Sequence, residues 1–382
     1  MKNLSIANKL LASAALFGMV ITGTSCDDDK ETMTPAADMV MMNNIMLSSQ
    51  QEVPANTSNA SGTYSIQYDK TSNQLAYTIN YSGITPTAMH FHKGDLGVAG
   101  GVEAEVVGPF SSGMKGNIKL TEAQEADLLA GKFYLNVHSA TFAAGELRGQ
   151  AVSEDKVVLS NIKLSGKQEV PSNASAATGT FNGLYDKKSK MLDYTIVLNG
   201  VTSAGMHLHK GAPGANGDVV MAIANMKGMT AAFTAAQEVD LLAGNLYLNV
   251  HSAGQPGGEI RGQVVSDQKV VFANRITGDQ EVGPTNSVAN GTIYAVYDKS
   301  NKKLTYTITY TGVAPTAMHF HKGAAGTNGG VEAEVVGPYS SGMTGSVTLT
   351  AAQEADLLKG LWYLNVHSTA FAGGEIRAQL VK

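Results

Sequence analysis

Ala88-Met89-His90-Phe91-His92-Lys93-Gly94 is the stretch that decides the fold, because it returns twice in a chain of 382 residues. The second copy lies at residues 205–211 and the third at residues 317–323. Apolar and polar side chains alternate within each copy, a pattern that predicts a half-buried β-strand. The Met and the Phe or Leu of each copy should then face a core, while the two histidines share the opposite face.

The repeat extends well beyond this strand. Three further motifs recur in the same order: Gln51-Glu52-Val53-Pro54 (again near 168 and 280), Tyr134-Leu135-Asn136-Val137-His138-Ser139 (again at 247–252 and 363–368), and Gly145-Glu146-Leu147-Arg148 (again at 258–261 and 374–377). Equivalent positions are 112 to 117 residues apart. This spacing is the size of a domain, whereas solenoid repeats have periods of roughly 20–50 residues. We therefore predict three tandem domains at residues 43–153, 157–266 and 270–382.

The strand patterns of one repeat predict its fold class. Residues 74–81 alternate and are rich in β-branched and aromatic side chains, and a polar turn joins them to a similar run at 64–68. One helix is expected after Thr121, because Thr121 and Gln124 form a capping-box pattern and Gly131 follows. The same pattern returns at 234–244 and 350–360. We predict an all-β fold with one short helix per domain, in antiparallel Greek-key-like β-sandwiches or barrels.

Residues 1–26 have the layout of a secretory signal. Two lysines precede a short apolar run at 10–21, which ends in small residues before Cys26, the only cysteine of the chain. The layout resembles a lipobox, in which cleavage leaves the cysteine as a lipidated N-terminus. The alternative is an ordinary secreted protein with an incidental thiol. We expect lipidation at Cys26, a tether over residues 27–42, and a cell-envelope protein at the outer membrane or cell surface.

The charge of the chain restricts its partners. Removing residues 1–26 takes away two lysines and no acids, leaving 25 basic and 32 acidic residues and a net charge of −7. No basic patch suits a nucleic acid, and the N-terminal lipid is the expected contact with a membrane. With 43% hydrophobic and 15% charged residues, the chain after the tether should be globular. An extracellular protein or glycan remains a candidate partner.

All nine histidines fall at three equivalent positions per repeat. They are His90, His92 and His138 in the first repeat, His207, His209 and His251 in the second, and His319, His321 and His367 in the third. If the two histidine-bearing strands of a repeat are neighbours, three imidazoles meet on a face away from the core. The favoured interpretation is that these histidines hydrogen-bond loops over an exposed face of the sheet. Neutral imidazole suits copper or zinc, so one three-histidine site for either metal per domain is the alternative.

Other polar residues also recur beside the histidine motifs. Glu146 and Arg148 share the face of His138 across a predicted hairpin, so Glu146 is expected to orient an imidazole or to pair with Arg148. Their counterparts are Glu259 and Arg261, and Glu375 and Arg377. Glu103 and Glu105 are better explained by alternation on a solvated strand face than as paired catalytic carboxylates. No nucleophile recurs beside a histidine, so hydrolytic chemistry is not expected.

The combined motifs resemble the CHRD domain, a family named from the animal protein chordin. The motifs are Met-His-Phe-His-Lys-Gly, the capped Thr-x-x-Gln-Glu helix, Tyr-Leu-Asn-Val-His-Ser and Gly-Glu-Ile-Arg-Gly-Gln, and together they cover nearly all of residues 43–382 in three copies. The resemblance implies a β-domain of secreted or surface proteins, usually without an assigned enzymatic activity. The growth-factor sequestration of chordin does not transfer to this chain, because family and fold do not determine function.

A more distant similarity links the His-x-His strand to copper/zinc superoxide dismutases, where such a pair ligates copper on the outside of a Greek-key barrel. His90 and His92 match that pair, but the chain lacks a separate zinc ligand set, a bridging histidine and an intradomain disulfide. A mononuclear, dismutase-like copper site is the minority interpretation. The preferred one is a non-enzymatic binding or structural module on a lipoprotein, and the alternative is a metalloprotein with one three-histidine site per domain.

Overall fold

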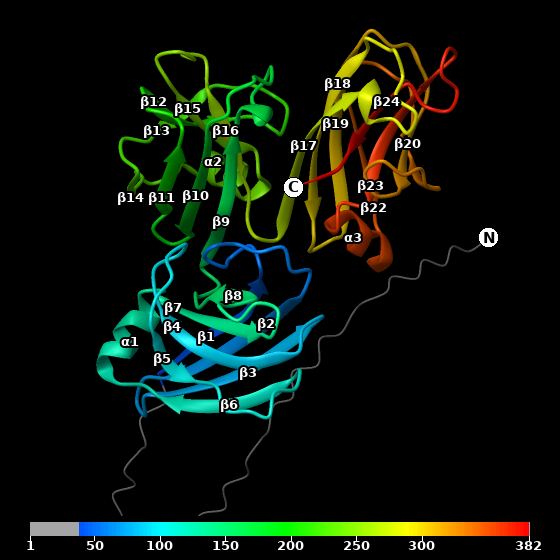
Figure 1. The fold of residues 1–382 in the computed structure, drawn as a ribbon. Coiled ribbons are helices and arrows are strands. Elements are labelled where there is room, and N and C mark those ends of the chain that lie inside the picture. Colours follow the sequence, from blue (N-terminus) through cyan, green and yellow to red (C-terminus); the bar gives the residue numbers. More distant parts are fainter. Residues whose placement is uncertain (1–37, 382) are drawn as a thin grey trace, which may run out of the picture. The chain divides into compact units, whose positions relative to one another are not determined.

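Each repeat forms its own eight-stranded antiparallel sheet in the computed structural model, which describes residues 38–381 (Figure 1). The predicted lipidation site Cys26, the signal segment and residues 27–37 of the tether lie outside the described residues. The strands of the first sheet are β1 (Met39–Ser48), β2 (Ser61–Asp69), β3 (Gln74–Ser82), β4 (Pro86–Lys93), β5 (Val102–Glu105), β6 (Met114–Lys119), β7 (Phe133–Ser139) and β8 (Leu147–Gln150).

The second and third sheets repeat this plan. The second contains β9 (Lys156–Ser165), β10 (Thr178–Asp186), β11 (Met191–Asn199), β12 (Gly205–Lys210), β13 (Val219–Ala222), β14 (Lys227–Met229), β15 (Leu246–His251) and β16 (Ile260–Val264). The third contains β17 (Lys269–Thr277), β18 (Asn290–Asp298), β19 (Lys303–Thr311), β20 (Pro315–Lys322), β21 (Val331–Glu334), β22 (Met343–Thr348), β23 (Trp362–Ser368) and β24 (Ile376–Gln379). Short 3₁₀ turns follow β9 and β17, at Gly166–Gln168 (η1) and Gly278–Gln280 (η2). The predicted all-β class is confirmed.

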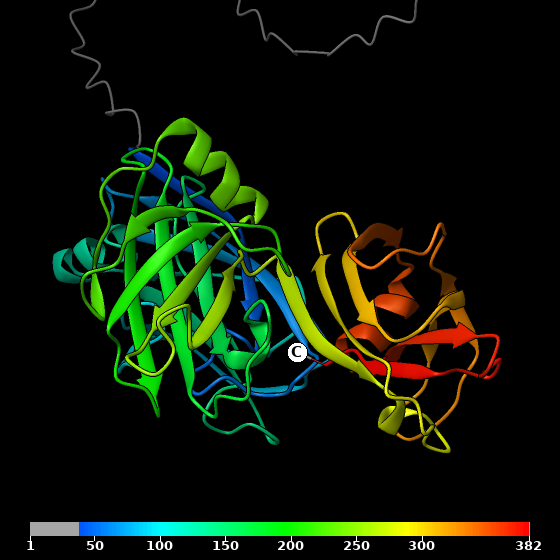
Figure 2. The same cartoon turned by 90° about the horizontal axis from the view of Figure 1, so that it is seen from above.

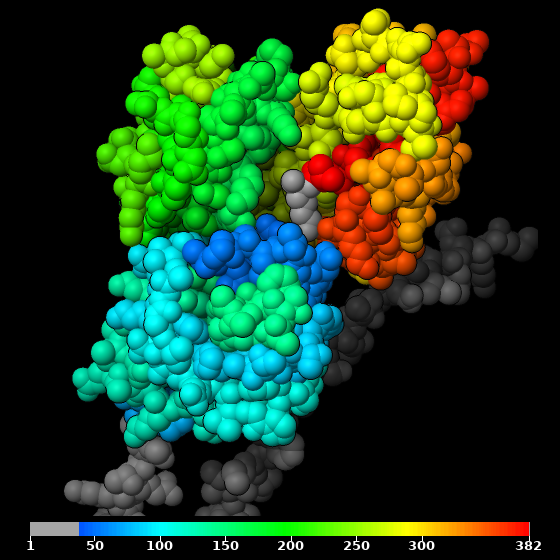
Figure 3. Space-filling model, in the orientation of Figure 1, coloured from blue at the N-terminus to red at the C-terminus, as the bar shows by residue number. Residues whose placement is uncertain are grey.

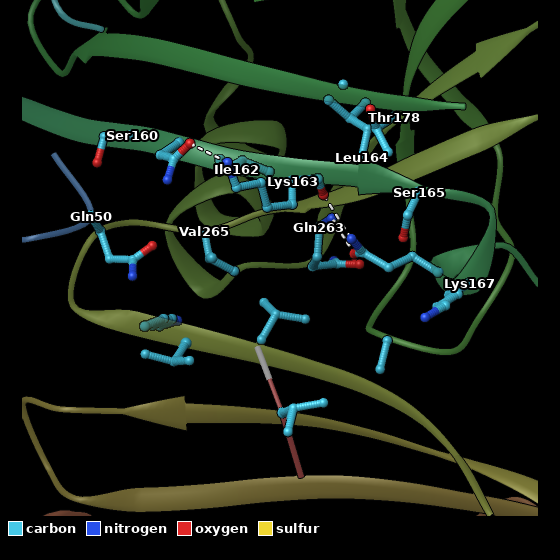
Figure 4. Close-up of a pocket in the computed structure, with 18 of the residues that line it drawn as sticks. Gln50, Ser160, Ile162, Lys163, Leu164, Ser165, Lys167, Thr178, Gln263 and Val265 are labelled. Carbon is cyan, nitrogen blue, oxygen red and sulfur yellow. Dashed lines mark hydrogen bonds between the residues drawn. The ribbon is translucent and has the colours of Figure 1, made fainter. Parts of the chain in front are cut away.

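The order of strands divides each sheet into two halves. In the first repeat the order is β5-β4-β7-β8-β1-β2-β3-β6, and β8 meets β1 through a single pair, Arg148 opposite Ser48. The sheet rolls on itself at this junction, and Figure 2 shows the curved sheets of the second copy (green) and the third copy (yellow to red) from above. Figure 4 shows the same junction in the second repeat, where Arg261 of β16 pairs with Ser165 of β9 and Gln263 lies beside Lys163. The result is a nearly closed, barrel-like fold.

The inside of each rolled sheet is a separate apolar core. In the first repeat it includes Tyr64, Phe91 and Leu135, all fully buried, and the clusters of the other repeats contain only their own residues. Figure 3 accordingly shows the atoms of each repeat, coloured from blue to red along the chain, filling their own volume. Met89 and Phe91 face this core, as the alternation in β4 predicts, and both are at most 1% exposed.

One capped helix per repeat lies between the sixth strand and the strand that carries the third histidine. The helices are α1 (Glu122–Leu129), α2 (Ala235–Ala243) and α3 (Ala351–Leu358). At α1 the Thr121 hydroxyl accepts from the Gln124 backbone N–H at 3.2 Å, and the Gln124 side chain accepts from the Thr121 N–H at 2.9 Å. This reciprocal bonding satisfies two N–H groups that a helix start leaves free. The predicted caps are confirmed in all three helices.

The predicted tether is too long at its C-terminal end. Strand β1 begins at Met39, so residues 39–42 belong to the sheet rather than to the tether. The physical reason is a bulge between Met42 and Ile45, where Asn44 takes a φ of 52°. The bulge shifts the alternation of inward and outward side chains along β1, so that Met42 and Ile45 both lie in the core. The apolar positions before the bulge are therefore out of step with those after it. No helix among residues 38–381 has the length and hydrophobicity needed to cross a membrane.

Candidate metal centre

The strands β4 and β7 bring the three histidines of the first repeat together. The two strands are antiparallel neighbours, with His90 opposite Asn136, His92 opposite Tyr134, and Ala88 opposite His138. His90 and His92 therefore share the outer face with His138, while the core residues of both strands point the other way. The pairing β12–β15 and the pairing β20–β23 do the same in the other repeats.

The ring nitrogens of each triad converge. One nitrogen from each histidine lies within 4.8 Å of the other two in every repeat. In the first repeat Nδ1 of His90 lies 3.2 Å from Nε2 of His138, and the third repeat has the same distance between His319 and His367. Three nitrogen ligands around one ion with metal–nitrogen bonds of about 2 Å need a separation of this order.

Backbone carbonyls accept the proton on the far side of two imidazoles per site. Nδ1 of His92 lies 3.0 Å from the Gly100 oxygen, and Nδ1 of His138 lies 3.0 Å from the Ala143 oxygen. These bonds hold the proton on Nδ1 and leave the lone pair of Nε2 directed at the other histidines. Metal-binding histidines are normally oriented in this way. The equivalent acceptors are Gly217 and Pro256 in the second repeat and Gly329 and Ala372 in the third.

The converging nitrogens of the second repeat have no hydrogen-bond partner. They are Nδ1 of His207, Nε2 of His209 and Nε2 of His251, and all three atoms are buried. Nε2 of His92 and Nε2 of His321 are also buried without a partner. Leaving a buried polar atom unsatisfied costs roughly 1–3 kcal/mol. The second repeat therefore has three unpartnered nitrogens where its rings meet, whereas in the first and third repeats two of the three converging nitrogens hydrogen-bond each other.

Burial lowers the pKa of several of these imidazoles and so favours their neutral form. It lowers the pKa of His92, and the neighbouring His90 and His138 lower it further, against the hydrogen bond to Gly100. Burial also lowers the pKa of His138, with a smaller effect from His90. The pKa values of His207, His209, His321 and His367 are lowered for the same primary reason. A neutral imidazole has the free lone pair that metal coordination requires.

A stack of three side chains supports the site from below. The ring of His92 is stacked on Tyr134 with the centroids 5.1 Å apart, and the guanidinium of Arg148 lies 3.5 Å from the centroid of the Tyr134 ring. The Tyr134 hydroxyl accepts from the Gly100 N–H at 2.9 Å, next to the carbonyl that holds His92. Tyr247 with Arg261, and Tyr363 with Arg377, form the same stack.

Arg148 thus supports the site, but not by pairing with Glu146, which the sequence suggested. Its guanidinium donates to the carbonyl oxygens of Val98 at 2.8 Å and Asp95 at 3.0 Å, and to the side chain of Gln150 at 2.8 Å. These bonds hold the turn that contains Gly100. The contribution of the Tyr134 ring was not predicted, although its motif with His138 recurs in all three repeats.

The prediction that Glu146 contacts His138 or Arg148 is wrong. Its carboxylate accepts from the hydroxyls of Ser58, at 2.6 Å, and Ser139. His138 bonds a turn carbonyl instead. The reason is that the loop before β2 folds over this corner of the sheet and supplies Ser58, which lies 88 residues away in the chain. Glu259 with Ser175, and Glu375 with Ser287, show the same contact.

A buried glutamate lies against the same face of each sheet. Burial raises the pKa of Glu52 to about 7, against the attraction of Arg148, and Nδ2 of Asn136 donates to its carboxyl at 3.5 Å. The other oxygens of the pair, Oε1 of Glu52 and Oδ1 of Asn136, have no partner, which a proton on the carboxyl would provide. Glu169 and Glu281 repeat the arrangement, also with pKa values raised to about 7 by burial.

These three carboxyls predict a pH-dependent stability. The pKa of each buried carboxyl is higher in the folded state than in the unfolded state. Its contribution to the stability of the domain is therefore complete below about pH 4.5 and is lost as the pH rises through 7. Changing Glu52, Glu169 and Glu281 together to Gln should remove this loss, which is about 3 kcal/mol per domain. Chemical unfolding in chelator at pH 5 and pH 8 measures it. A variant at exposed Glu122 should keep the original profile, and equal pH profiles for the triple variant and the original chain would contradict the prediction.

The comparisons with known proteins agree with the repeat. The family model of the CHRD domain matches residues 44–151, 161–264 and 272–380. No curated protein and no solved structure matches the chain. The three matches together cover most of the chain and coincide with the three sheets, each with its own histidine triad. The chain therefore belongs to the CHRD domain family, in three tandem copies.

Proposed function

We propose that each CHRD domain of this chain binds one copper or zinc ion through its three histidines. The observation that carries the proposal is the second-domain triad, where three buried ring nitrogens converge without any hydrogen-bond partner. Two rings of this triad bond a carbonyl oxygen through Nδ1 and direct their other nitrogen at the cluster, which a loop-holding role alone does not require. The loop-holding role that the sequence left open accounts for only half of this arrangement.

The ligand set supports copper or zinc over harder cations. Three neutral imidazoles without a carboxylate among the converging atoms suit zinc, Cu(II) or Cu(I), whereas magnesium and calcium prefer oxygen ligands. Three protein ligands leave a coordination position for water or a small ligand. Because no recurring nucleophile or base accompanies the triads, we propose capture or storage of the metal rather than an enzymatic reaction.

The location and partners of the chain are part of the same proposal. We propose that lipidation at Cys26 anchors the three domains to a membrane of the cell envelope, outside the cytoplasm. A second candidate role is that of a non-enzymatic spacer or binding module, and the tandem copies favour it because linked domains raise the avidity for a repetitive protein or glycan surface. Deleting one domain should then weaken adhesion in the absence of metal, which the metal proposal does not expect.

Metal titration tests the main proposal. The chain from residue 27 onward, stripped with chelator and dialysed against Zn²⁺ or Cu²⁺, should retain close to three equivalents by elemental analysis. Retention should fall below about pH 6, because protons compete for the imidazole nitrogens. Absence of specific uptake of either metal at pH 7.5 would rule the proposal out.

A further inference from the structure

We propose that Glu105 and Glu334 accept the outer proton of the first histidine when a metal occupies the first and third sites, and that the second site binds metal more weakly because it has Ala222 at this position. This inference rests on the proposed metal binding and makes the three sites unequal. It assigns a positioning role to a strand-edge carboxylate that lies outside the histidine triad itself.

The register of β4 and β5 places the carboxylate beside the histidine. Glu105 is directly opposite His90, and Ala104, its neighbour in the chain, packs against the core with Phe91. Glu105 therefore faces outward on the same side as His90. The Val106 N–H donates to the Met89 carbonyl at 3.0 Å, which makes the next pair, His90 and Glu105, a non-hydrogen-bonded one. Side chains of such pairs approach most closely.

The third repeat has the same geometry. Glu334 is directly opposite His319, and the Val335 N–H donates to the Met318 carbonyl at 3.0 Å. Ala333 packs against the core of that repeat, as its counterpart does in the first. Two independent sheets therefore place a glutamate next to the first histidine of the site.

The first histidine of each site needs an acceptor that the backbone does not supply. His90 directs Nδ1 at the other rings, so its proton must lie on Nε2 when Nδ1 binds a metal. The other two histidines give their outer protons to carbonyl oxygens, but no hydrogen bond to Nε2 of His90 occurs among the described residues. A carboxylate is a common acceptor for the outer proton of a metal-bound imidazole, and Glu105 is the carboxylate in register.

The second repeat lacks two supports at this place. Ala222 is opposite His207, and Gly205 stands where the other repeats have Ala88 and Ala317. A Cβ at Gly205 would lie 3.6 Å from Cε1 of His207, at an ordinary packing distance. The His207 ring lacks this contact because residue 205 is glycine. The rings also differ in placement. Nδ1 of His207 has no partner, whereas in the other two sites this atom lies 3.2 Å from a neighbouring ring nitrogen.

Competition with a chelator tests the inequality, with Zn²⁺ as the probe and all three domains in one chain. Loss of a partner that orients a metal-bound imidazole typically weakens binding 10–100-fold. The original chain should therefore show two tight equivalents and one weaker by about that factor. Ala222→Glu together with Gly205→Ala should raise the weak equivalent toward the other two. Glu105→Ala with Glu334→Ala should lower the tight pair to the level of the second site.

Two controls separate positioning from general effects. Glu103→Ala changes a carboxylate on the same strand that binds the side chain of Gln124 at 3.0 Å, and it should leave zinc affinity unchanged. Glu105→Gln keeps an oxygen acceptor and should retain part of the affinity that Glu105→Ala loses. Three indistinguishable affinities in the original chain, or an Ala222→Glu variant without effect, would overturn this inference alone. A chain that takes up no zinc would overturn the proposed function together with it.

Discussion

Replacing Arg377 by alanine is expected to destabilise the third domain by about 3–5 kcal/mol. Arg377 is 1% exposed, and its guanidinium carbon lies 3.4 Å from the centroid of the Tyr363 ring. It donates to the carbonyl oxygens of Thr327 at 2.9 Å and Ala324 at 3.1 Å, and to the side chain of Gln379 at 2.9 Å. Alanine leaves a cavity below the ring and removes the donors of these three oxygens, and both losses are costly inside a protein.

The third domain offers its own reporter for this measurement. Trp362, the only tryptophan of the chain, is fully buried in the core of that domain, so its fluorescence follows the unfolding of that domain. Arg377→Ala should shift the urea midpoint of the fluorescence transition strongly downward. The matched change Arg148→Ala, in the first domain, should leave this transition in place because the two cores are separate.

Arg377→Lys separates charge from geometry. Lysine keeps the charge but is a single point donor without the planar fork that lies over the Tyr363 ring. It should therefore recover less than half of the stability lost with alanine. A loss of 1 kcal/mol or less for Arg377→Ala would show that the stacked arginine is not a structural support of the face that carries the histidines.

The parts of this fold that the sequence predicts are those with a local cause. The alternation in β4 and the capping box of Thr121 and Gln124 act over a few residues, and both are observed. The convergence of the histidines was predictable as well, because His90, His92 and His138 needed only the right face and the right neighbouring strand. Each of these inferences depends on spacing within a motif.

The supports of the site depend on contacts between distant segments. The carbonyl oxygens of Gly100 and Ala143 accept the histidine protons, and a backbone carbonyl has no side-chain identity that a motif could reveal. The Glu146 carboxylate accepts a hydrogen bond from Ser58 because the loop before β2 packs over the end of the sheet where Glu146 lies. The bulge near Asn44 likewise depends on the pairing of β1 with β2, which moved the start of the sheet into the predicted tether.

Changing His207, His209 and His251 together to alanine is expected to remove about one of three bound metal equivalents. Elemental analysis of the metal-loaded chain measures this loss. Without metal, the same variant should be only about 1–2 kcal/mol less stable than the original chain, because the loss of the hydrogen bonds to Gly217 and Pro256 is offset in part by the removal of three buried nitrogens that have no partner. Calorimetry in chelator measures that second quantity.

The two readouts together separate metal binding from a purely structural role. If the imidazoles serve mainly to hold the loops at Gly217 and Pro256, the variant should lose several kcal/mol in chelator, and bound metal should not change by a whole equivalent. A metal site predicts the reverse, since unused acceptors are destabilising until an ion occupies them. The original chain should then gain about 2.7 kcal/mol in the second domain at a free metal concentration 100 times the Kd, and the variant should not. Nε2 of His92, His209 and His321 is buried without a partner at the same position of all three domains. A bound ion would offset the free-energy cost of leaving these atoms unsatisfied.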